Sequence, residues 1–408
     1  MINNKLISIN NYHYRRGGAE VIFLEHNRLF QDHGWEVATF CMHHPMNTPT
    51  PWESYFVEET EFGRSYTIIE RAVRAARVVY SHHARKKLEA LISRFTPGIA
   101  HAHNVYHHIS PAIFPLLKNL GIPTVMTIHD LKLACPAYLM FSGGAVCEKC
   151  RGGRLHNVVL NKCIKSSLAL SSLIYIEAVA QRLLKTYEAN VDKFVVPSKF
   201  HIEKLVQWGW PRERFVHIPN FVKLDDFNAA NTSGEGFVYI GRLDSRKGID
   251  TLVRASAISS QPVTIVGTGP AENDLKKLSD RVGAKVRFVG FQTGEKLRGA
   301  VSASLALILP SLLYENGPVS IMEAYALGRP AIGARIGGIP EHIREDETGL
   351  TFSPGSSEDL ADKMRQFAEM PRSRKLEMGA AARKLAETEF SPALYRTRIL
   401  SLYNQLQR

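Results

Sequence analysis

The chain has 408 residues, of which 45% are hydrophobic and 22% charged, and its formal net charge is +12. This length predicts two domains, and the composition excludes a disordered or fibrous chain. No run of about 18 apolar residues predicts a transmembrane helix, and the start "MINNKLISIN" lacks a signal peptide's pattern, so we expect a cytoplasmic protein.

Apolar runs alternate with helical patterns in the first half of the chain. We predict strands over 5–10, 35–40, 98–103 and 123–129, and a helix over 18–32. This alternation is typical of a doubly wound parallel sheet, whose ligands bind where strands end. Gly17 and Gly18 open the first helix, where bare N–H groups favour an anion; tight turns use glycines as well.

A basic segment spans residues 64–95, with eight basic and two acidic residues and apolar residues at helical spacing. One interpretation is one or two core-packed helices with a solvated basic side. The other is a basic amphipathic surface for anionic lipid head groups. No nucleic-acid-binding motif occurs, so nucleic acid is not an expected partner.

Four of the five cysteines cluster in a loop over about 131–165, just after His129 and Asp130: Cys135, Cys147, Cys150 and Cys163. A central C-x2-C with two outlying cysteines predicts a closed structural zinc site, because thiolates suit tetrahedral Zn²⁺. The alternative is a set of reduced thiols packed in an inserted flap.

The pattern restarts after residues 192–198, with strands over 236–241, 262–267, 285–290, 305–310 and 330–334. We therefore expect a first domain at 1–197, a second at 198–389 and a terminal helix within 390–408, with the linker near 196–221. The loop after the second of these strands holds Gly267 and Gly269, which lack the third glycine of a dinucleotide fingerprint.

The stretch "GRLDSRKG" follows the first strand of the second half and carries Arg242 and Lys247. We expect a helix to begin near 248–250. Two cations and a helix N-terminus would then converge at one strand end, which suits a diphosphate. A solvated basic turn is the alternative.

The stretch "YENGPVSIMEA" spans 314–324 and holds two glutamates. Pro318 fits a first helical turn, with Gly317 near the N-cap. Glu315 then lies before the helix, able to accept sugar hydroxyls, and Glu323 lies in its second turn, able to bind a ribose. Ordinary surface acids are the alternative. A glycosidase pair is disfavoured, because its two carboxyls must flank one bond.

Together these stretches resemble the retaining nucleotide-sugar glycosyltransferases of family four, the glycosyl transferases group 1. "YENGPVSIMEA" resembles the family's Glu-x7-Glu motif, and "GRLDSRKG" resembles Gly-Arg-Leu-x-x-x-Lys-Gly. "RRGGAE", "IHD", "IPNF" and "GGIPE" resemble further family segments, with Phe221 in place of a usual glycine. The resemblance implies the GT-B fold, in which two Rossmann-like domains face a central cleft and the terminal helix crosses back onto the first domain.

The resemblance also implies residue roles. Arg242 and Lys247 would bind the donor diphosphate, Glu323 the ribose and Glu315 the donor sugar, with His129 near the transferred sugar. The remaining donor-binding residues would be Gly17, Gly18, Gly267, Phe291, Asn316, Gly317, Pro318 and Val319. Many relatives have Gly-Phe-Gly where this chain has Asn316-Gly317-Pro318. A Glu-Asn-x-Pro variant also occurs in polysaccharide-assembly enzymes, so we expect the sugar recognised to differ and the site to be intact.

The expected function is transfer of a sugar, with retention, from a nucleotide-diphosphate sugar to a glycan or lipid-linked acceptor in cell-envelope or exopolysaccharide biosynthesis. The alternative is a nucleotide-sugar epimerase or phosphorylase on the same fold. No Asp-x-Asp motif occurs, so we expect no catalytic metal or other catalytic cofactor, and zinc only as a structural ion. The net charge of +8 in residues 1–200 suits peripheral contact with an anionic membrane, at the inner face of the cell membrane.

Overall fold

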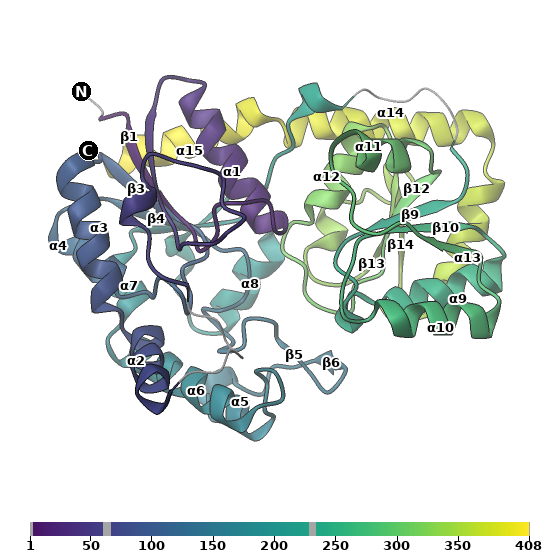
Figure 1. Ribbon diagram of the computed structural model, residues 1–408. Coiled ribbons are helices and arrows are strands. Elements are labelled where there is room, and N and C mark those ends of the chain that lie inside the picture. The colour runs from purple at the N-terminus through teal and green to yellow at the C-terminus, as the bar shows by residue number, and fades with distance from the viewer. Residues whose placement is uncertain (1–2, 60–66, 228–233, 408) are drawn as a thin grey trace.

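The computed structural model describes residues 3–59, 67–227 and 234–407. It has two α/β domains side by side (Figure 1), each built on a six-stranded sheet of parallel strand pairs. The strand order is β2-β1-β3-β4-β7-β8 in the first sheet and β11-β10-β9-β12-β13-β14 in the second. The predicted pair of doubly wound sheets is confirmed.

In its described residues, the first domain contains six sheet strands, a small hairpin and eight α-helices. The sheet strands are Lys5–Ile9 (β1), Glu36–Phe40 (β2), Ile99–Ala102 (β3), Thr124–Thr127 (β4), Lys193–Val196 (β7) and Phe215–His217 (β8). The hairpin strands are Phe141–Ser142 (β5) and Ala145–Val146 (β6). The helices are Gly18–Gln31 (α1), Ile68–Val79 (α2), His82–Phe95 (α3), Ile113–Asn119 (α4), Asn157–Leu160 (α5), Leu168–Leu183 (α6), Thr186–Asn190 (α7) and Lys199–Gln207 (α8).

The second domain alternates strands and helices, and the chain ends in two long helices. The strands are Phe237–Ile240 (β9), Val263–Val266 (β10), Val286–Phe288 (β11), Ala306–Leu309 (β12), Ala331–Ala334 (β13) and Gly349–Phe352 (β14). The helices are Ile249–Ser259 (α9), Glu272–Val282 (α10), Gly294–Ser302 (α11), Val319–Ala326 (α12), Ser357–Glu369 (α13), Arg372–Glu389 (α14) and Pro392–Leu406 (α15). Single 3-10 turns at Ser245–Lys247 (η5) and Ile339–Glu341 (η6) precede α9 and follow β13.

The structure differs from the expectation at the domain boundary, in two strands and at the start of one helix. Strand β8 pairs with β7, so the first sheet continues past the boundary placed at 197, and α8 and β8 belong with the first domain. Strands β8 and β14 were not predicted. Helix α12 begins at Val319 with Pro318 as its N-cap, one residue later than expected. Residues 64–66 of the basic segment lie outside the described residues, and the rest forms α2 and α3.

Each sheet changes direction at one point, and these points place the ligand-binding loops. The order reverses between β1 and β3 in the first sheet and between β9 and β12 in the second. Open α/β sheets bind ligands at the carboxyl ends of the strands beside such a point. The loops after β1, β9 and β12 hold the glycine pair, "GRLDSRKG" and "YENGPVSIMEA".

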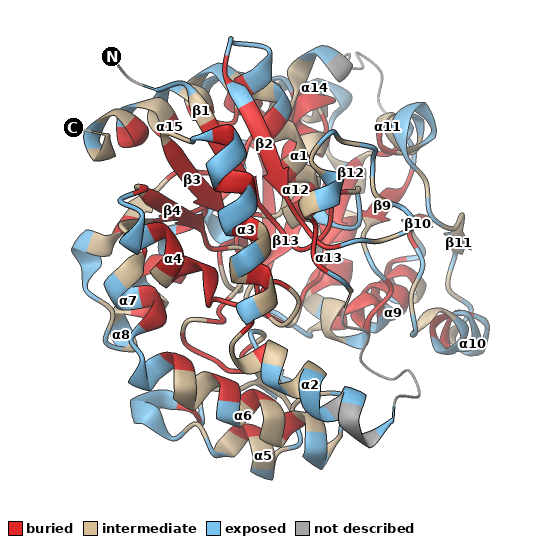
Figure 2. Cartoon of the chain, turned by 60° about the vertical axis from the view of Figure 1, so that its left-hand side comes forward, coloured by how far each residue is buried: buried red, intermediate tan, exposed pale blue. Residues whose placement is uncertain are grey.

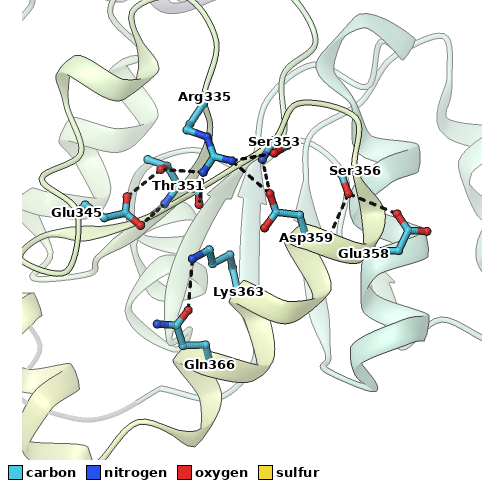
Figure 3. A network of polar contacts seen from close by, with 9 residues as sticks. All are labelled: Arg335, Glu345, Thr351, Ser353, Ser356, Glu358, Asp359, Lys363 and Gln366. Carbon is cyan, nitrogen blue, oxygen red and sulfur yellow. Dashed lines mark hydrogen bonds and ion pairs between the residues drawn. The ribbon is translucent and has the colours of Figure 1, made fainter.

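The central strands of both sheets are buried, which Figure 2 shows in red. At the far edge of the second sheet the core ends in a polar network (Figure 3). Asp359 Oδ2 accepts the Ser353 N–H at 2.7 Å, and Arg335 donates to Ser353 Oγ at 2.7 Å. Thr351 donates to Glu345 at 2.8 Å. The network ties β13, β14 and α13 together.

The terminal helix α15 returns to the first domain and lies beside α1 (Figure 1). Its buried side, with Ile399, Leu402 and Tyr403, packs into a cluster with Leu6 and Phe30. Among the described helices, none is long and apolar enough to cross a membrane.

Candidate functional site

The loops at the two switch points meet across the domain interface. Gly17 is the N-cap of α1, which begins at Gly18 as predicted. A Cβ atom on Gly18 would lie 3.6 Å from Cγ2 of Val319, the first residue of α12. The glycine loop of the first domain therefore packs against the helix start of the second.

An ion pair joins the two sequence stretches of the second domain. Glu315 Oε1 accepts hydrogen bonds from Lys247 Nζ at 2.7 Å and from Ser311 Oγ at 2.8 Å. The side chains of Lys247 and Glu315 are 29% and 13% exposed, so both are partly desolvated and still reachable by a ligand. Ser311 was not foreseen, because a serine in a loop carries no distinctive signal.

Two further arginines lie near Lys247. Arg242 is exposed at the end of β9. Arg246 donates to Asp244, through Nε at 2.7 Å, and is occupied by that pair. Gly248 has φ 65°, and a Cβ there would lie 2.0 Å from the Pro310 carbonyl oxygen. Only glycine permits this turn, which brings Lys247 beside Glu315 and starts α9 at Ile249.

The first domain holds the "YENGP" loop by hydrogen bonds. Asn316 Nδ2 donates to the Ile128 carbonyl at 2.6 Å, and Asn220 Nδ2 donates to the Gly317 carbonyl at 2.8 Å. Asn316 was expected to hold the donor sugar through its backbone amide, and its side-chain amide anchors the loop to the end of β4. Asn220 belongs to the "IPNF" segment, to which the sequence assigned no role.

The "GGIPE" segment also connects the domains. Glu341 accepts the backbone N–H groups of Lys199 at 2.8 Å and Phe200 at 2.6 Å, at the start of α8. Gly338 N–H donates to the Glu315 carbonyl at 2.7 Å. The "GGIPE" segment, for which the sequence analysis gave only a family resemblance, thus positions Glu315 and caps a helix of the first domain.

Glu323 lies in the second turn of α12, as predicted. Its side chain is half-buried, and within the described part of the chain its carboxylate receives no hydrogen bond. Burial raises the pKa of Glu323 to about 7, and the nearby charge of Arg15 acts in the opposite direction. A carboxylate without a partner at the interface can accept ligand hydroxyls.

His129 lies at the end of β4 and stacks on His103, with ring centroids 5.1 Å apart. His103 Nδ1 and His129 Nε2 share a hydrogen bond of 2.8 Å. Burial lowers the pKa of His129 to about 4, so at neutral pH this ring is an uncharged hydrogen-bonding group. The predicted site residue therefore carries no positive charge there.

His103 continues into a buried column of histidines beneath the site. His26, His101 and His103 place ring nitrogens within 4.8 Å of one another, the one such potential metal-binding group among the described residues. Both His101 nitrogens are already bonded, to Tyr403 and to Thr127, and both His26 nitrogens face tyrosine hydroxyls of α15. We interpret the column as a group of buried hydrogen bonds that holds α15 against the first domain.

Asp130 and Lys132 follow His129 and lead into the flap. Burial raises the pKa of Asp130 to about 6, although the Lys132 backbone N–H and charge oppose this. Lys132 Nζ pairs with Glu177 Oε2 of α6 at 2.6 Å, and both side chains are buried. This ion pair fixes the start of the flap against α6.

Gly267 and Phe291 complete the predicted set. Gly267 has φ 142°, and a Cβ there would lie 1.9 Å from the Gly241 carbonyl oxygen. The close approach of two strand-end loops therefore requires this glycine, whatever it binds. Phe291 is 64% exposed beside the end of β11, which leaves its ring free to stack on a ligand.

The four flap cysteines line one small cavity of about 10 Å³. All are free thiols, and no three of their sulfur atoms form one of the close ligand groups found among the described residues. Between two of them, Glu148 accepts from Lys204 of α8 at 2.6 Å and from the Tyr314 hydroxyl at 3.2 Å. The cysteine loop therefore contacts the residue next to Glu315.

Two family models match the chain in series. Residues 16–226, more than half of the chain, match Glycosyltransferase Family 4. Residues 223–385 match Glycosyl transferases group 1. The boundary between the two matches coincides with the passage from one sheet to the other, and both families are those of the predicted resemblance.

Two curated relatives cover different shares of the chain. Sulfoquinovosyl transferase SQD2 of Arabidopsis thaliana is 28% identical over 308 residues, which is 73% of this chain and 54% of that protein. Lipopolysaccharide core biosynthesis glycosyltransferase LpsD of Rhizobium meliloti is 28% identical over 229 residues, which is 54% of this chain and 65% of that protein. The chain thus spans between half and two thirds of the length of these relatives.

Among solved structures, sucrose-phosphate synthase from Thermosynechococcus elongatus matches 98% of both chains with a TM-score of 0.72 and 20% identity. This likeness confirms the predicted GT-B fold. The comparisons give no support to the epimerase or phosphorylase alternative.

Proposed function

The chain belongs to glycosyltransferase family 4, and from this premise we propose that it transfers a sugar from a nucleotide-diphosphate sugar to a glycan or lipid-linked acceptor, with retention at the anomeric carbon. The reaction class follows from the family. The residues that would perform it are assigned below from their geometry.

The observation that carries the proposal is the 2.7 Å contact between Lys247 and Glu315. It places a cation and a hydroxyl acceptor side by side at the ends of β9 and β12, next to the start of α12. A nucleotide-diphosphate sugar needs such a pair, because its diphosphate is anionic and its sugar carries hydroxyls. When the donor binds, Lys247 would bond to the diphosphate in place of Glu315, and Glu315 would then accept hydrogen bonds from the sugar hydroxyls.

Cleavage of the sugar–phosphate bond leaves negative charge on the diphosphate. Arg242 and Lys247, which stand ready near the start of α9, would stabilise that charge as it develops. Two cations can thereby supply the charge neutralisation that a divalent metal supplies in other transferases, and we propose that transfer is independent of metal.

The other side of the sugar would face the first domain. His129 is held by His103 and is neutral, so it would orient a sugar hydroxyl by a hydrogen bond rather than by charge. Glu323 would accept the ribose hydroxyls, and the exposed Phe291 would flank the base.

A panel of UDP-, GDP- and other nucleotide sugars tests the proposal by thermal shift and by hydrolysis. One donor should raise the melting temperature of the wild-type protein and not that of Lys247→Ala. If no nucleotide sugar stabilises the wild-type protein more than the variant, the donor assignment fails.

For the acceptor, we propose a molecule of cell-envelope or exopolysaccharide biosynthesis. One relative is named for lipopolysaccharide core biosynthesis, and the first domain is basic. Transfer of labelled sugar to membrane lipid extracts, compared with soluble oligosaccharides, distinguishes a lipid-linked acceptor from a free glycan. Release of altered sugar without an acceptor product would contradict the transferase assignment.

We further propose that the four flap cysteines hold a structural zinc ion. All four line one cavity in a loop-rich segment with two-residue strands, where a metal often replaces a hydrophobic core. Zinc would draw the sulfur atoms together and order the Glu148 loop. Elemental analysis should find zinc in wild-type protein and less in Cys150→Ser; zinc-free protein with normal activity would contradict the site.

A further inference from the structure

Helix α6 has its apolar and polar sides reversed. Leu168, Ile176 and Leu183 are 56%, 54% and 78% exposed. They are spaced eight and seven residues apart, which places them on one side of the helix. The buried side carries the polar Ser171, Glu177 and Gln181 together with the apolar Ile174.

The polar residues on the inner side have partners, so the reversed orientation is stable. Glu177 pairs with Lys132 at 2.6 Å, and Gln181 Nε2 donates to the Val79 carbonyl of α2 at 2.6 Å. The exposed apolar side is unusual, because a helix of a globular domain normally turns an apolar stripe toward the core.

The exposed apolar side is part of a larger surface. Leu160 of α5 is 72% exposed, and Leu184, directly after α6, is 59% exposed. Figures 1 and 2 place α2, α5 and α6 together at one end of the first domain. We call the surface formed by these five exposed apolar residues the α6 face: Leu160, Leu168, Ile176, Leu183 and Leu184.

The surroundings of the α6 face are basic. Within residues 151–187, all of which are described, six basic residues are exposed: Arg151, Arg154, Lys162, Lys165, Arg182 and Lys185. The only acid in this range is the buried Glu177. Exposed leucines interspersed with cations match the boundary between the head groups and acyl chains of an anionic bilayer. An exposed acid, Glu188, follows three residues after Lys185.

A second copy of the chain is a poorer match. A symmetric dimer would place the α6 face against itself and bring the six cations of one copy close to those of the other. Like charges would then oppose the association, whereas anionic lipid head groups neutralise them.

We propose that the α6 face is the membrane-docking surface of this protein, with the leucines and Ile176 entering the lipid boundary and the ring of cations binding anionic phospholipid. This inference deepens the proposed function, since it names the surface at which the enzyme would meet a membrane-borne acceptor. It names a different surface from residues 64–95, for which the sequence left two interpretations, core-packed helices or a lipid-binding surface.

Co-sedimentation with phosphatidylcholine vesicles, with and without phosphatidylglycerol, tests the proposal at low and high salt. Wild-type protein should bind the anionic vesicles at low salt and bind them less at high salt. Ile176→Glu/Leu183→Glu should abolish binding. Lys162→Glu/Lys185→Glu should weaken it at least thirtyfold, which is roughly the effect of losing two basic residues near a membrane, because each glutamate also adds a repelling charge.

Matched controls lie on the second domain. Ile258→Glu changes a residue that is 46% exposed, and Lys276→Glu changes a surface lysine; both should bind vesicles as wild type does. Circular dichroism confirms folding of each variant, and the donor-induced thermal shift should survive in all of them, which separates this inference from the donor assignment. Equal vesicle binding by wild type and Ile176→Glu/Leu183→Glu would overturn it, as would a concentration-dependent dimer that only these changes disrupt.

Discussion

At the scale of single residues, the contact between Lys247 and Glu315 decides how the site works before a donor arrives. Each charge satisfies the other, so neither stands unpaired at the interface in the free protein. A diphosphate can displace Glu315 from Lys247 because it brings more negative charge. The pair therefore keeps both residues in place for the donor.

We expect Lys247→Ala and Arg242→Ala each to lower turnover by well over tenfold and by at most about 150-fold. This range follows because one charge-assisted hydrogen bond contributes about 1.5–3 kcal/mol. Glu315→Gln should also reduce transfer strongly, because the amide accepts fewer sugar hydroxyls. Initial rates at saturating donor measure the effect. Lys276→Ala, which removes a surface ion pair of the same domain, is the control, and native rates in both cation variants would contradict the diphosphate assignment.

Glu323 predicts a pH dependence of donor binding. Its pKa is raised to about 7 by burial, so below pH 7 the free enzyme holds a protonated carboxyl that accepts hydroxyls less well. The KM for donor should rise as the pH falls below 7 and level off above it. Donor KM measured on either side of pH 7 tests this, and Glu323→Gln should have a high, flat KM.

If Glu323→Gln keeps the wild-type pH profile, the titrating group lies elsewhere, and Asp130 becomes the candidate. Because its pKa is about 6, the rise in the KM for donor would then occur about one pH unit lower. Asp130→Asn therefore serves as the matched control for the Glu323 variant.

At the scale of elements, the flap is joined to α6 by the buried ion pair of Lys132 and Glu177. Removing one partner of such a pair leaves a buried charge without compensation and costs about 3–5 kcal/mol. We expect Lys132→Met to lower the free energy of unfolding by that amount in a guanidinium titration. The double variant Lys132→Met/Glu177→Leu should recover most of the loss.

The exposed pair of Lys276 and Glu272, 48% and 27% exposed, provides the comparison. Breaking a surface pair costs at most about 1 kcal/mol, so Lys276→Met should change little. A Lys132→Met protein as stable as wild type would show that water reaches Glu177.

The strands and helices that the sequence predicts correctly are those with strong local signals. Helix α1 after Gly17, α9 after Gly248 and the position of Glu323 on α12 follow from glycine, proline and the hydrophobic pattern. Strand β8 was missed because its three residues lie in the stretch 196–221, which the sequence pattern indicated as a linker. Because β8 belongs to the first sheet, the first domain extends beyond the boundary expected at residue 197.

Contacts between distant segments could not be predicted in this way. Glu341 binding the start of α8, or Asn316 binding Ile128, depends on how two domains pack, and a local pattern carries no record of that. The reversed α6 is a related case, because its composition predicts a helix but not which side faces the core.

At the scale of the whole molecule, buried histidines should make stability depend on pH. Burial lowers the pKa of five histidines from 6.5 to about 3 or 4: His26, His108, His129, His201 and His342. In the unfolded chain these rings bind protons below pH 6.5, while in the folded chain they do not. The unfolded state therefore gains stability as the pH falls from 6.5 toward 4.

Two carboxyls act in the opposite direction. The folded pKa values of Glu323 and Asp130, about 7 and about 6, lie above the ordinary 4.5 and 3.8, so the folded state binds these protons first. Five histidines against two carboxyls leave a net difference of about three protons, and burial also lowers the pKa of His101, His103 and His107 well below 6.5. The free energy of unfolding should then fall by at least about 4 kcal/mol per pH unit at its steepest, from about 1.4 kcal/mol per proton.

Guanidinium titrations at a series of pH values below 7 measure this slope, and one variant tests its origin. His342 is buried, and neither ring nitrogen has a hydrogen-bond partner within the described chain, so His342→Leu removes one titrating group without breaking a known bond. Its slope should be about 1.4 kcal/mol per pH unit shallower than that of the wild-type protein. Stability that stays constant down to pH 5 in wild-type protein would mean that the buried rings become protonated in the folded state, and it would remove the physical basis for a neutral His129 in the site.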